Sequence, residues 1–170
     1  SAVCSGSPVT LSAFSTGIGS GPQTLPTGYA TSNATSTADE DIFNVTLGSL
    51  SNTSDCNTTA PDAGSIKNEY SNYTASVAPP TITAGQTVPF SITVGTCGTT
   101  NYNNKVAFYI DWNRSGTFES NEQVYATAGA TSGPNNVSGT FTVPMDATAG
   151  VTLLRAIVME TTSGTIAPTG

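Results

Sequence analysis

Apolar and polar residues alternate with a period of two along most of the chain after about residue 40. The clearest alternating sets are Phe43, Val45 and Leu47; Val88, Phe90, Ile92 and Val94; Val106, Phe108, Ile110 and Trp112; Val137, Phe141 and Val143; and Leu154, Ala156 and Val158. A period of two places successive side chains on opposite faces of an extended strand. The pattern therefore predicts strands over residues 41–50, 88–94, 105–112, 123–126, 137–143 and 151–160.

Turn-forming residues separate these runs at 84–85, 95–104, 132–134 and 144–150, where Gly, Pro and Asn gather. No segment has the spacing of an amphipathic helix. Several alternating strands at turn-rich intervals are typical of two packed antiparallel sheets. We therefore predict an all-β fold, an antiparallel β-sandwich of jelly-roll or Greek-key type.

The first 38 residues lack this periodicity and are rich in Ser, Thr, Gly and Pro. We interpret them as an extended leader that precedes one sandwich domain spanning residues 39–170. Part of the leader alternates well enough to form a strand if another sheet edge accepts it. The residues of this candidate donor strand are Pro8, Val9, Leu11, Ala13 and Phe14.

The composition excludes several functions. The chain has a net charge of -7 and no histidine. An acidic surface repels phosphate backbones, so we expect no nucleic-acid partner. Without histidine, a Ser-His-Asp triad cannot form, and we expect no zinc catalysis. Carboxylate pairs can hydrolyse glycosides without histidine, but no Asp/Glu pair is set apart here. We expect a protein that is not an enzyme and has no membrane span.

Residues 111–122 have the spacing of a twelve-residue calcium loop, D-x-N-x-S-G-x5-E. Oxygen-bearing side chains fall at alternating positions, a glycine stands where the chain must turn, and a carboxylate ends the loop. Strands flank it, so it is not a helix-loop-helix sensor. The alternative is a polar hairpin that binds nothing. The candidate Ca²⁺ ligands are Asp111, Asn113, Ser115, Thr117, Glu119 and Glu122.

Three segments resemble the GEVED domain family: 39–48, 70–74 and 94–98. The resemblance continues through 109–118, 139–144, 149–150 and 153–155. It implies a β-sandwich from secreted or surface-attached bacterial proteins, without catalytic residues, and an acidic metal loop at 111–122. Ser115 departs from the carboxylate that the family usually has there. The resemblance also implies a disulfide between Cys56 and Cys97, which leaves Cys4 unpaired.

The family takes its name from a Gly-Glu-Val-Glu-Asp segment in a last strand, which would follow the region that matches residues 166–170. Without that strand, we expect an open slot with an unpaired strand edge and exposed apolar core. Arg155 lies on the face of Leu153 and Ile157, and we expect a carboxylate partner such as Glu160 or Asp146.

Two functional hypotheses follow. The first is an extracellular or cell-surface, calcium-binding subunit of a filament or surface layer, which associates with identical subunits when the leader of one fills the slot of the next. The second is an accessory module for a surface glycan or cell surface, cut from a larger secreted protein. A leader that folds back into its own sandwich would contradict strand donation and favour the second hypothesis.

Overall fold

The computed structural model describes residues 8–11, 24–32, 34, 39–57, 62–66 and 69–169. Almost all its regular structure is β-strand. Beside one 3-10 turn, Ser120–Glu122, the elements are β1 Pro8–Leu11, β2 Glu40–Leu47, β3 Leu50–Thr53, β4 Thr81–Thr83, β5 Thr87–Thr96, β6 Asn103–Ile110, β7 Gln123–Ala126, β8 Thr131–Ser132, β9 Asn135–Thr142, β10 Val151–Thr152 and β11 Leu154–Glu160. Among the described residues, no helix is long and apolar enough to cross a membrane.

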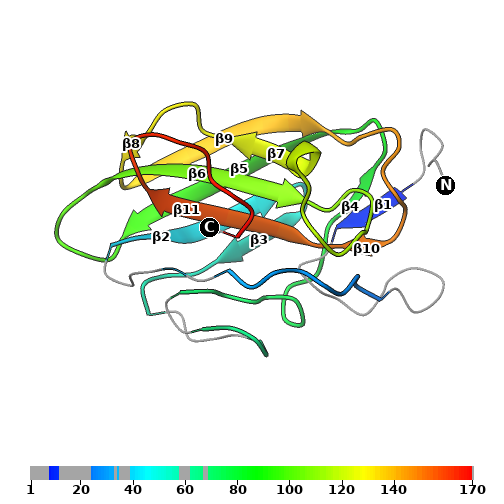
Figure 1. The fold of residues 1–170 in the computed structure, drawn as a ribbon, viewed down its shortest axis with the longest axis horizontal. Coiled ribbons are helices and arrows are strands. Elements are labelled where there is room, and N and C mark those ends of the chain that lie inside the picture. The colour runs from blue at the N-terminus through cyan, green and yellow to red at the C-terminus, as the bar shows by residue number, and fades with distance from the viewer. Residues whose placement is uncertain are drawn as a thin grey trace.

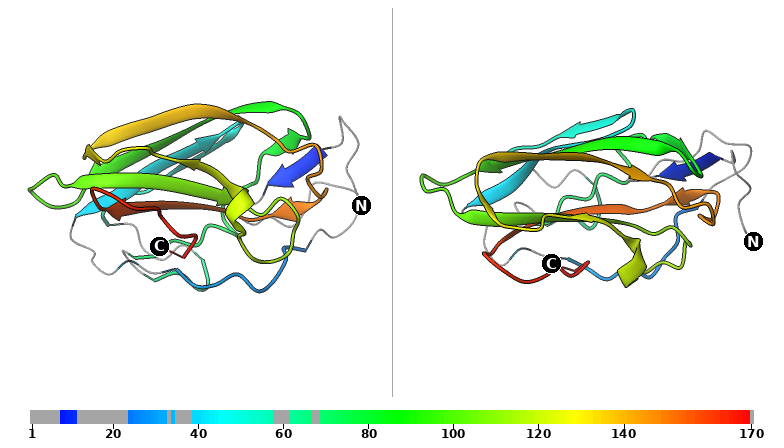
Figure 2. Two further views of the ribbon diagram at one scale, coloured as in Figure 1. Left: turned by 45° about the horizontal axis from the view of Figure 1, so that its top comes forward. Right: turned by 90° about the horizontal axis from the view of Figure 1, so that it is seen from above.

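Two antiparallel four-stranded sheets face each other (Figures 1 and 2). One sheet has the order β3-β2-β5-β9, and the other has the order β11-β6-β7 with β8 also paired to β6. The predicted all-β sandwich is confirmed. Two edge strands, β3 and β11, belong to opposite sheets.

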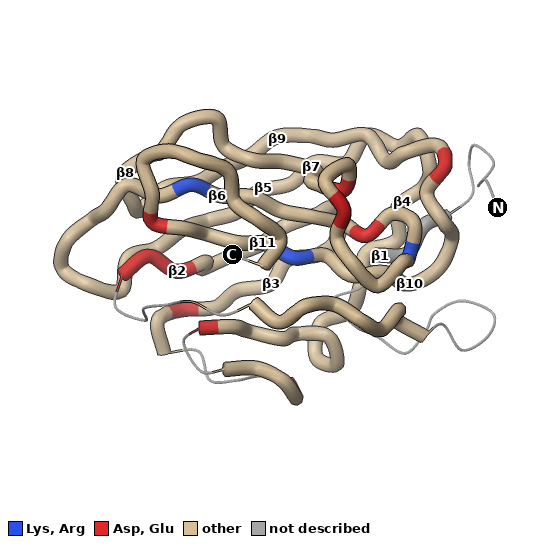
Figure 3. Tube along the Cα trace, viewed as in Figure 1, with Lys and Arg blue, Asp and Glu red and all other residues tan. Residues whose placement is uncertain are grey.

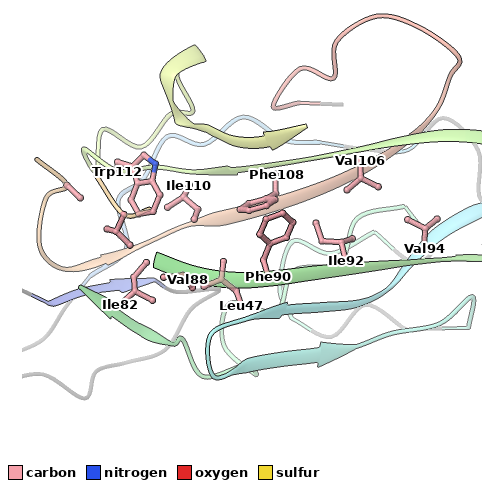
Figure 4. Close-up of a cluster of buried hydrophobic side chains, with 12 residues drawn as sticks. Leu47, Ile82, Val88, Phe90, Ile92, Val94, Val106, Phe108, Ile110 and Trp112 are labelled. Atoms are coloured by element: carbon pink, nitrogen blue, oxygen red, sulfur yellow. The ribbon is translucent and has the colours of Figure 1, made fainter. Parts of the chain in front are cut away.

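The core lies between the facing strands β5 and β6 (Figure 4). Every second residue of β5 points inward, and the rings of Phe90 and Phe108 meet edge to face with centroids 4.8 Å apart. Trp112 packs against the same cluster, one residue beyond the loop's first ligand candidate. The fully buried members of the cluster include Val88, Ile92, Val94, Val106, Phe108 and Ile110.

The prediction of one strand over residues 41–50 is wrong in two respects. The chain reverses at Gly48, whose φ of 56° favours glycine, so Leu47 pairs with Leu50 across a tight hairpin. The register of β2 also shifts between Ile42 and Asn44, which marks a bulge. Because of the bulge, Ile42 joins Val45 and Leu47 against the core, and the Phe43 ring covers Gly95 instead.

Strand β1 in the predicted leader pairs with two strands of its own chain. It lies between β4, to which it is antiparallel, and β10, to which it is parallel. Val9 is opposite Ile82, and Thr10 is opposite Val151. The pairing of β1 with β10 is parallel, whereas all pairs within the two four-stranded sheets are antiparallel. In the single chain, β1 therefore pairs within its own sheet, which counts against its donation to a second copy. Ala13 and Phe14, the other residues of the predicted donor strand, lie outside the described residues.

A disulfide joins Cys56, which follows β3, to Cys97, which follows β5, with a Cα–Cα distance of 5.4 Å. This is the pairing that the resemblance implies. Disulfides persist in oxidising compartments and are rare in the cytosol. Cys4 lies outside the described residues.

Candidate metal centre

The predicted calcium loop leaves the end of β6 and returns to β7 through the 3-10 turn. Figure 3 shows acidic positions gathered in this connection. One carboxylate oxygen from each of Asp111, Glu119 and Glu122 lies within 4.8 Å of the others. Asp111 and Glu122 are 0% and 1% exposed. Two buried acids and a third at their side could hold a metal ion.

Three polar side chains complete the cluster around Glu119. One Glu119 oxygen accepts hydrogen bonds from Ser115 Oγ at 2.8 Å and from Thr117 Oγ1 at 3.0 Å. The other accepts one from Asn113 Nδ2 at 3.1 Å. All six residues predicted from the loop spacing therefore converge in one place, and their role as ligands stays a prediction.

The backbone turn is built around Asp111. Its two carboxylate oxygens accept the N–H groups of Ser115 at 3.1 Å and of Gly116 at 3.0 Å. Gly116 has a φ of 84°, and a Cβ there would lie 2.1 Å from the carbonyl oxygen of Thr27. Glycine is thus required both by the backbone conformation and by the close approach of residue 27.

Glu122 ties the two ends of the loop together. Its Oε1 accepts the N–H groups of Trp112 at 2.8 Å and Asn113 at 3.3 Å, and its Oε2 accepts the N–H of Glu119 at 3.0 Å. These hydrogen bonds connect the start of the loop to its end.

The two glutamates also influence each other's ionisation. Burial, followed by the hydrogen bond with Glu119, raises the pKa of Glu122 to about 7. The hydrogen bond with Glu122, followed by that from Ser115, lowers the pKa of Glu119. A proton shared between the two carboxyl groups reduces the repulsion between their charges. A bound cation can reduce the same repulsion in place of the proton.

The donor set fits a hard cation. Every side chain in the cluster offers oxygen, and the carbonyl oxygen of Thr117 faces Ser115 Oγ at 3.2 Å. Carboxylate, amide, hydroxyl and carbonyl oxygens are the ligands of Ca²⁺ and Mg²⁺, whereas zinc and copper prefer nitrogen and sulfur. When bound, the ion would neutralise the acids and cross-link the ends of the loop.

The sequence did not indicate the part that residues 24–30 take in this centre. Tyr29 donates a hydrogen bond of 2.5 Å to Asp111, and its ring lies 5.1 Å from that of Phe118. Arg114 Nη2 donates to the carbonyl oxygen of Thr24 at 2.8 Å. Burial and the neighbouring Asp111 raise the pKa of Tyr29 well above its usual range, so the phenol stays a donor. The end of the predicted leader thus supports the loop.

Tyr29→Phe is expected to weaken metal binding by about tenfold, because groups that orient a ligand typically contribute 10–100-fold to affinity. The phenyl ring retains the contact with Phe118, so the melting temperature in a chelator should change little. Titration calorimetry with calcium measures the affinity. Tyr102→Phe, at an exposed site away from the loop, is the matched control. Equal calcium affinities for the two variants would contradict a supporting role for Tyr29.

These observations define a class of protein: an all-β sandwich with a cluster of acidic side chains in the loop between β6 and β7. Comparison with family models finds the GEVED domain at residues 105–170. The match covers β6 from Lys105 onward, the 111–122 loop and β11. The search of curated proteins gives no match. The search of solved structures gives none either.

Proposed function

We propose that this protein is a non-catalytic, extracellular β-sandwich that binds calcium in the β6–β7 loop and has a structural role, as a subunit of a filament or surface layer. The convergence of six oxygen-bearing residues on one point is the observation that carries the calcium assignment. The GEVED match and the Cys56–Cys97 disulfide support an extracellular location.

In this proposal the ion holds the ends of β6 and β7 together. Asp111 follows the last residue of β6, and Glu122 immediately precedes β7. Holding both carboxylates on one ion fixes the two strands to each other. It also fixes residues 24–30, which contact Asp111, Arg114 and Gly116. Calcium thereby couples the segment that follows β1 to the sandwich.

Assembly by strand donation requires β1 to exchange partners. The pairings that β1 makes with β4 and β10 in its own chain can form equally with those strands of a second copy. Such an exchange is heterologous, so it propagates an open fibre if the rotation between subunits does not close. The pairing within one chain must open first, and concentrated protein favours the exchanged form.

Deletion of residues 1–23 is expected to abolish fibre formation and to leave calcium binding intact, because it removes β1 and retains Thr24 and Tyr29. Electron microscopy of the full chain and of the deletion variant, at high concentration with calcium, measures the effect. Fibres from the full chain alone support the filament subunit. Fibres from both would contradict donation by β1.

The second candidate function is an accessory module that binds a surface glycan or a cell surface. It is favoured by the pairing of β1 with β4 and β10 of its own chain, which requires no second copy. Monodisperse monomers of the full chain in the same micrographs would favour this module over the filament subunit.

A further inference from the structure

Residues 24–30, here called the strap, lie against the calcium loop as an irregular segment without helix or strand (Figure 1). Among the described residues, no backbone–backbone hydrogen bond attaches the strap to the sandwich. Most of its residues are exposed. A segment with few backbone hydrogen bonds and high exposure opens locally at a low cost in free energy. The side chains that hold the strap therefore decide whether it stays docked.

Arg155 holds one end of the strap from β11. Its Nη2 donates to the carbonyl oxygen of Ala30 at 2.8 Å, and its Nη1 donates to that of Pro168 at 2.8 Å. The expected pairing of Arg155 with Glu160 or Asp146 is wrong, because the guanidinium bonds to these carbonyl oxygens instead. Since Arg155 belongs to a strand of the sandwich, this attachment does not depend on the calcium loop.

Arg114 holds the other end of the strap from the calcium loop. Its Nη2 donates to the carbonyl oxygen of Thr24 at 2.8 Å. Its Nε donates to that of Val151, the first residue of β10, at 2.9 Å, and its Nη1 to that of Ala149 at 3.4 Å. A guanidinium presents several donors in a fixed fork. One side chain thus joins the loop, the strap and the start of β10.

The backbone of Arg114 has an unusual conformation that the loop maintains. Its φ is 60°, which is uncommon for a residue other than glycine and persists where the surroundings determine it. The N–H of the next residue, Ser115, donates to Asn113 Oδ1 at 2.8 Å and to Asp111 Oδ1 at 3.1 Å. Asn113 and Asp111 are candidate calcium ligands. The direction of the Arg114 side chain therefore follows from how these ligands are oriented.

The strap contacts the loop at two further points. Tyr29 donates to Asp111 at 2.5 Å, and the Thr27 carbonyl oxygen lies so close to Gly116 that no Cβ fits there. An ion that fixes Asp111 also fixes the acceptor of this tyrosine. Without an ion, the three neighbouring acids of the loop repel one another, which favours a more open loop. Calcium therefore favours the loop conformation that holds the strap.

We propose that calcium acts as a latch on the strap and that Arg114 transmits its effect. The inference rests on the proposed calcium site and adds a regulated step to it. With calcium bound, the strap stays docked and resists extracellular proteases. When calcium is lost, the end at Thr24 is released and the peptide bond after Tyr29 becomes accessible. Coupling between two sites is reciprocal, so a docked strap raises the calcium affinity by the same factor.

Limited digestion of the full chain with chymotrypsin measures the opening of the strap. Chymotrypsin cleaves after large apolar and aromatic residues but not before proline. In the strap, Leu25 is followed by Pro26, so Tyr29 is the usable site. Tyr29 is half-buried, so cleavage requires the strap to open. When opening and closing are fast relative to cleavage, the rate is proportional to the open population.

Cleavage after Tyr29, followed by mass spectrometry, is expected to be about tenfold faster in chelator than in saturating calcium, a typical size for coupling between two sites. Cleavage after Tyr102 is the internal control. Tyr102 is 44% exposed and precedes β6, whereas the calcium loop follows that strand. Its rate should be the same in both solutions, which also controls for any response of the protease itself to calcium.

Arg114→Gly tests the transmitting residue. Glycine adopts the positive φ without strain, so the variant removes the guanidinium and retains the backbone conformation. In saturating calcium, Tyr29 of this variant should be cleaved about as fast as in the wild type with chelator. By reciprocity, calorimetry should still detect calcium binding, about tenfold weaker. Ser120→Gly, at an exposed residue of the same loop, is the matched control and should behave as the wild type.

Arg114→Lys separates charge from geometry. Lysine retains the positive charge, but a single ammonium group cannot reproduce the guanidinium fork that reaches both Thr24 and Val151. Its cleavage after Tyr29 in calcium should also be faster than in the wild type. Melting curves establish that each variant folds. If Arg114→Gly does not fold, Arg114→Lys and the wild type decide the matter.

The outcomes distinguish the latch from the calcium site on which it rests. Saturable calcium binding with equal cleavage after Tyr29 in calcium and chelator would overturn the latch and leave the calcium site standing. Absence of calcium binding would overturn both. Equal acceleration after Phe108, which is buried in the core, would mean global unfolding and would overturn the latch. Wild-type protection in a folded Arg114→Gly would overturn the role of Arg114.

Discussion

Replacement of both Cys56 and Cys97 by Ser is expected to lower the free energy of unfolding by roughly 3–4 kcal/mol. The bridge spans a sequence separation of 41 residues, and closing a loop of that length restricts the unfolded chain by about this amount in the chain-entropy model. For a chain of this size, each kcal/mol shifts the melting temperature by about 2–4 °C, so a fall of about 6–16 °C should follow.

The matched control is Cys4→Ser, which removes a thiol and no predicted bridge. Its melting temperature should equal that of the wild type. Thiol counting on denatured, unreduced protein should find one free cysteine in the wild type. Three free thiols would contradict both the bridge and the extracellular assignment. An unchanged melting temperature in the double variant would contradict the stabilisation by the bridge.

Removal of calcium from the wild-type protein is expected to lower its melting temperature by about 5–10 °C. An ion that binds only the native state stabilises it by about 2.7 kcal/mol at a hundredfold excess over Kd. Each kcal/mol again corresponds to about 2–4 °C in melting temperature. Differential scanning calorimetry in calcium and in chelator measures the difference.

Two single charge removals localise the effect. Glu119→Gln removes a candidate ligand that is partly exposed, so the chelated protein should stay folded and the calcium effect should shrink. Asp146→Asn removes the same charge from an exposed site outside the loop and should retain the full effect. A calcium effect of equal size in both variants would place the ion elsewhere.

The strands that could be predicted from sequence are those that bury one face in the core. In β5 and β6 the apolar alternation is regular, because both strands pack against each other in the middle of the sandwich. The strands that the pattern missed are short and lie at edges: β3 has few apolar residues, and β4 has three residues in all. An edge strand is specified by its pairing partners more than by its own sequence.

The 151–160 segment shows a second limit of the pattern. Its apolar run predicts one strand, but the structure divides it at Leu153. Val151 and Thr152 pair with β1, and the residues from Leu154 onward pair with β6. Both halves contain buried residues, so hydrophobicity cannot distinguish one strand from two that belong to different sheets.

The residues of the candidate metal loop could be predicted because they are local: ligand spacing, the glycine turn and the last carboxylate all lie within twelve positions. Tyr29 could not be predicted, since it is 82 residues from Asp111 in sequence and meets it only through the path of the chain. The surroundings of Arg155 are also nonlocal, because they combine carbonyls from residues 30 and 168 with two distant rings.

The most direct test of the calcium assignment is a crystal structure of the protein grown with calcium, with the anomalous signal used to locate the ion. We expect one ion among Asp111, Glu119 and Glu122, coordinated by six to eight oxygens at about 2.3–2.6 Å, with Ser115 or Asn113 and the Thr117 carbonyl among the ligands. A loop that keeps the hydrogen bonds described above and shows no anomalous peak in saturating calcium would contradict the account.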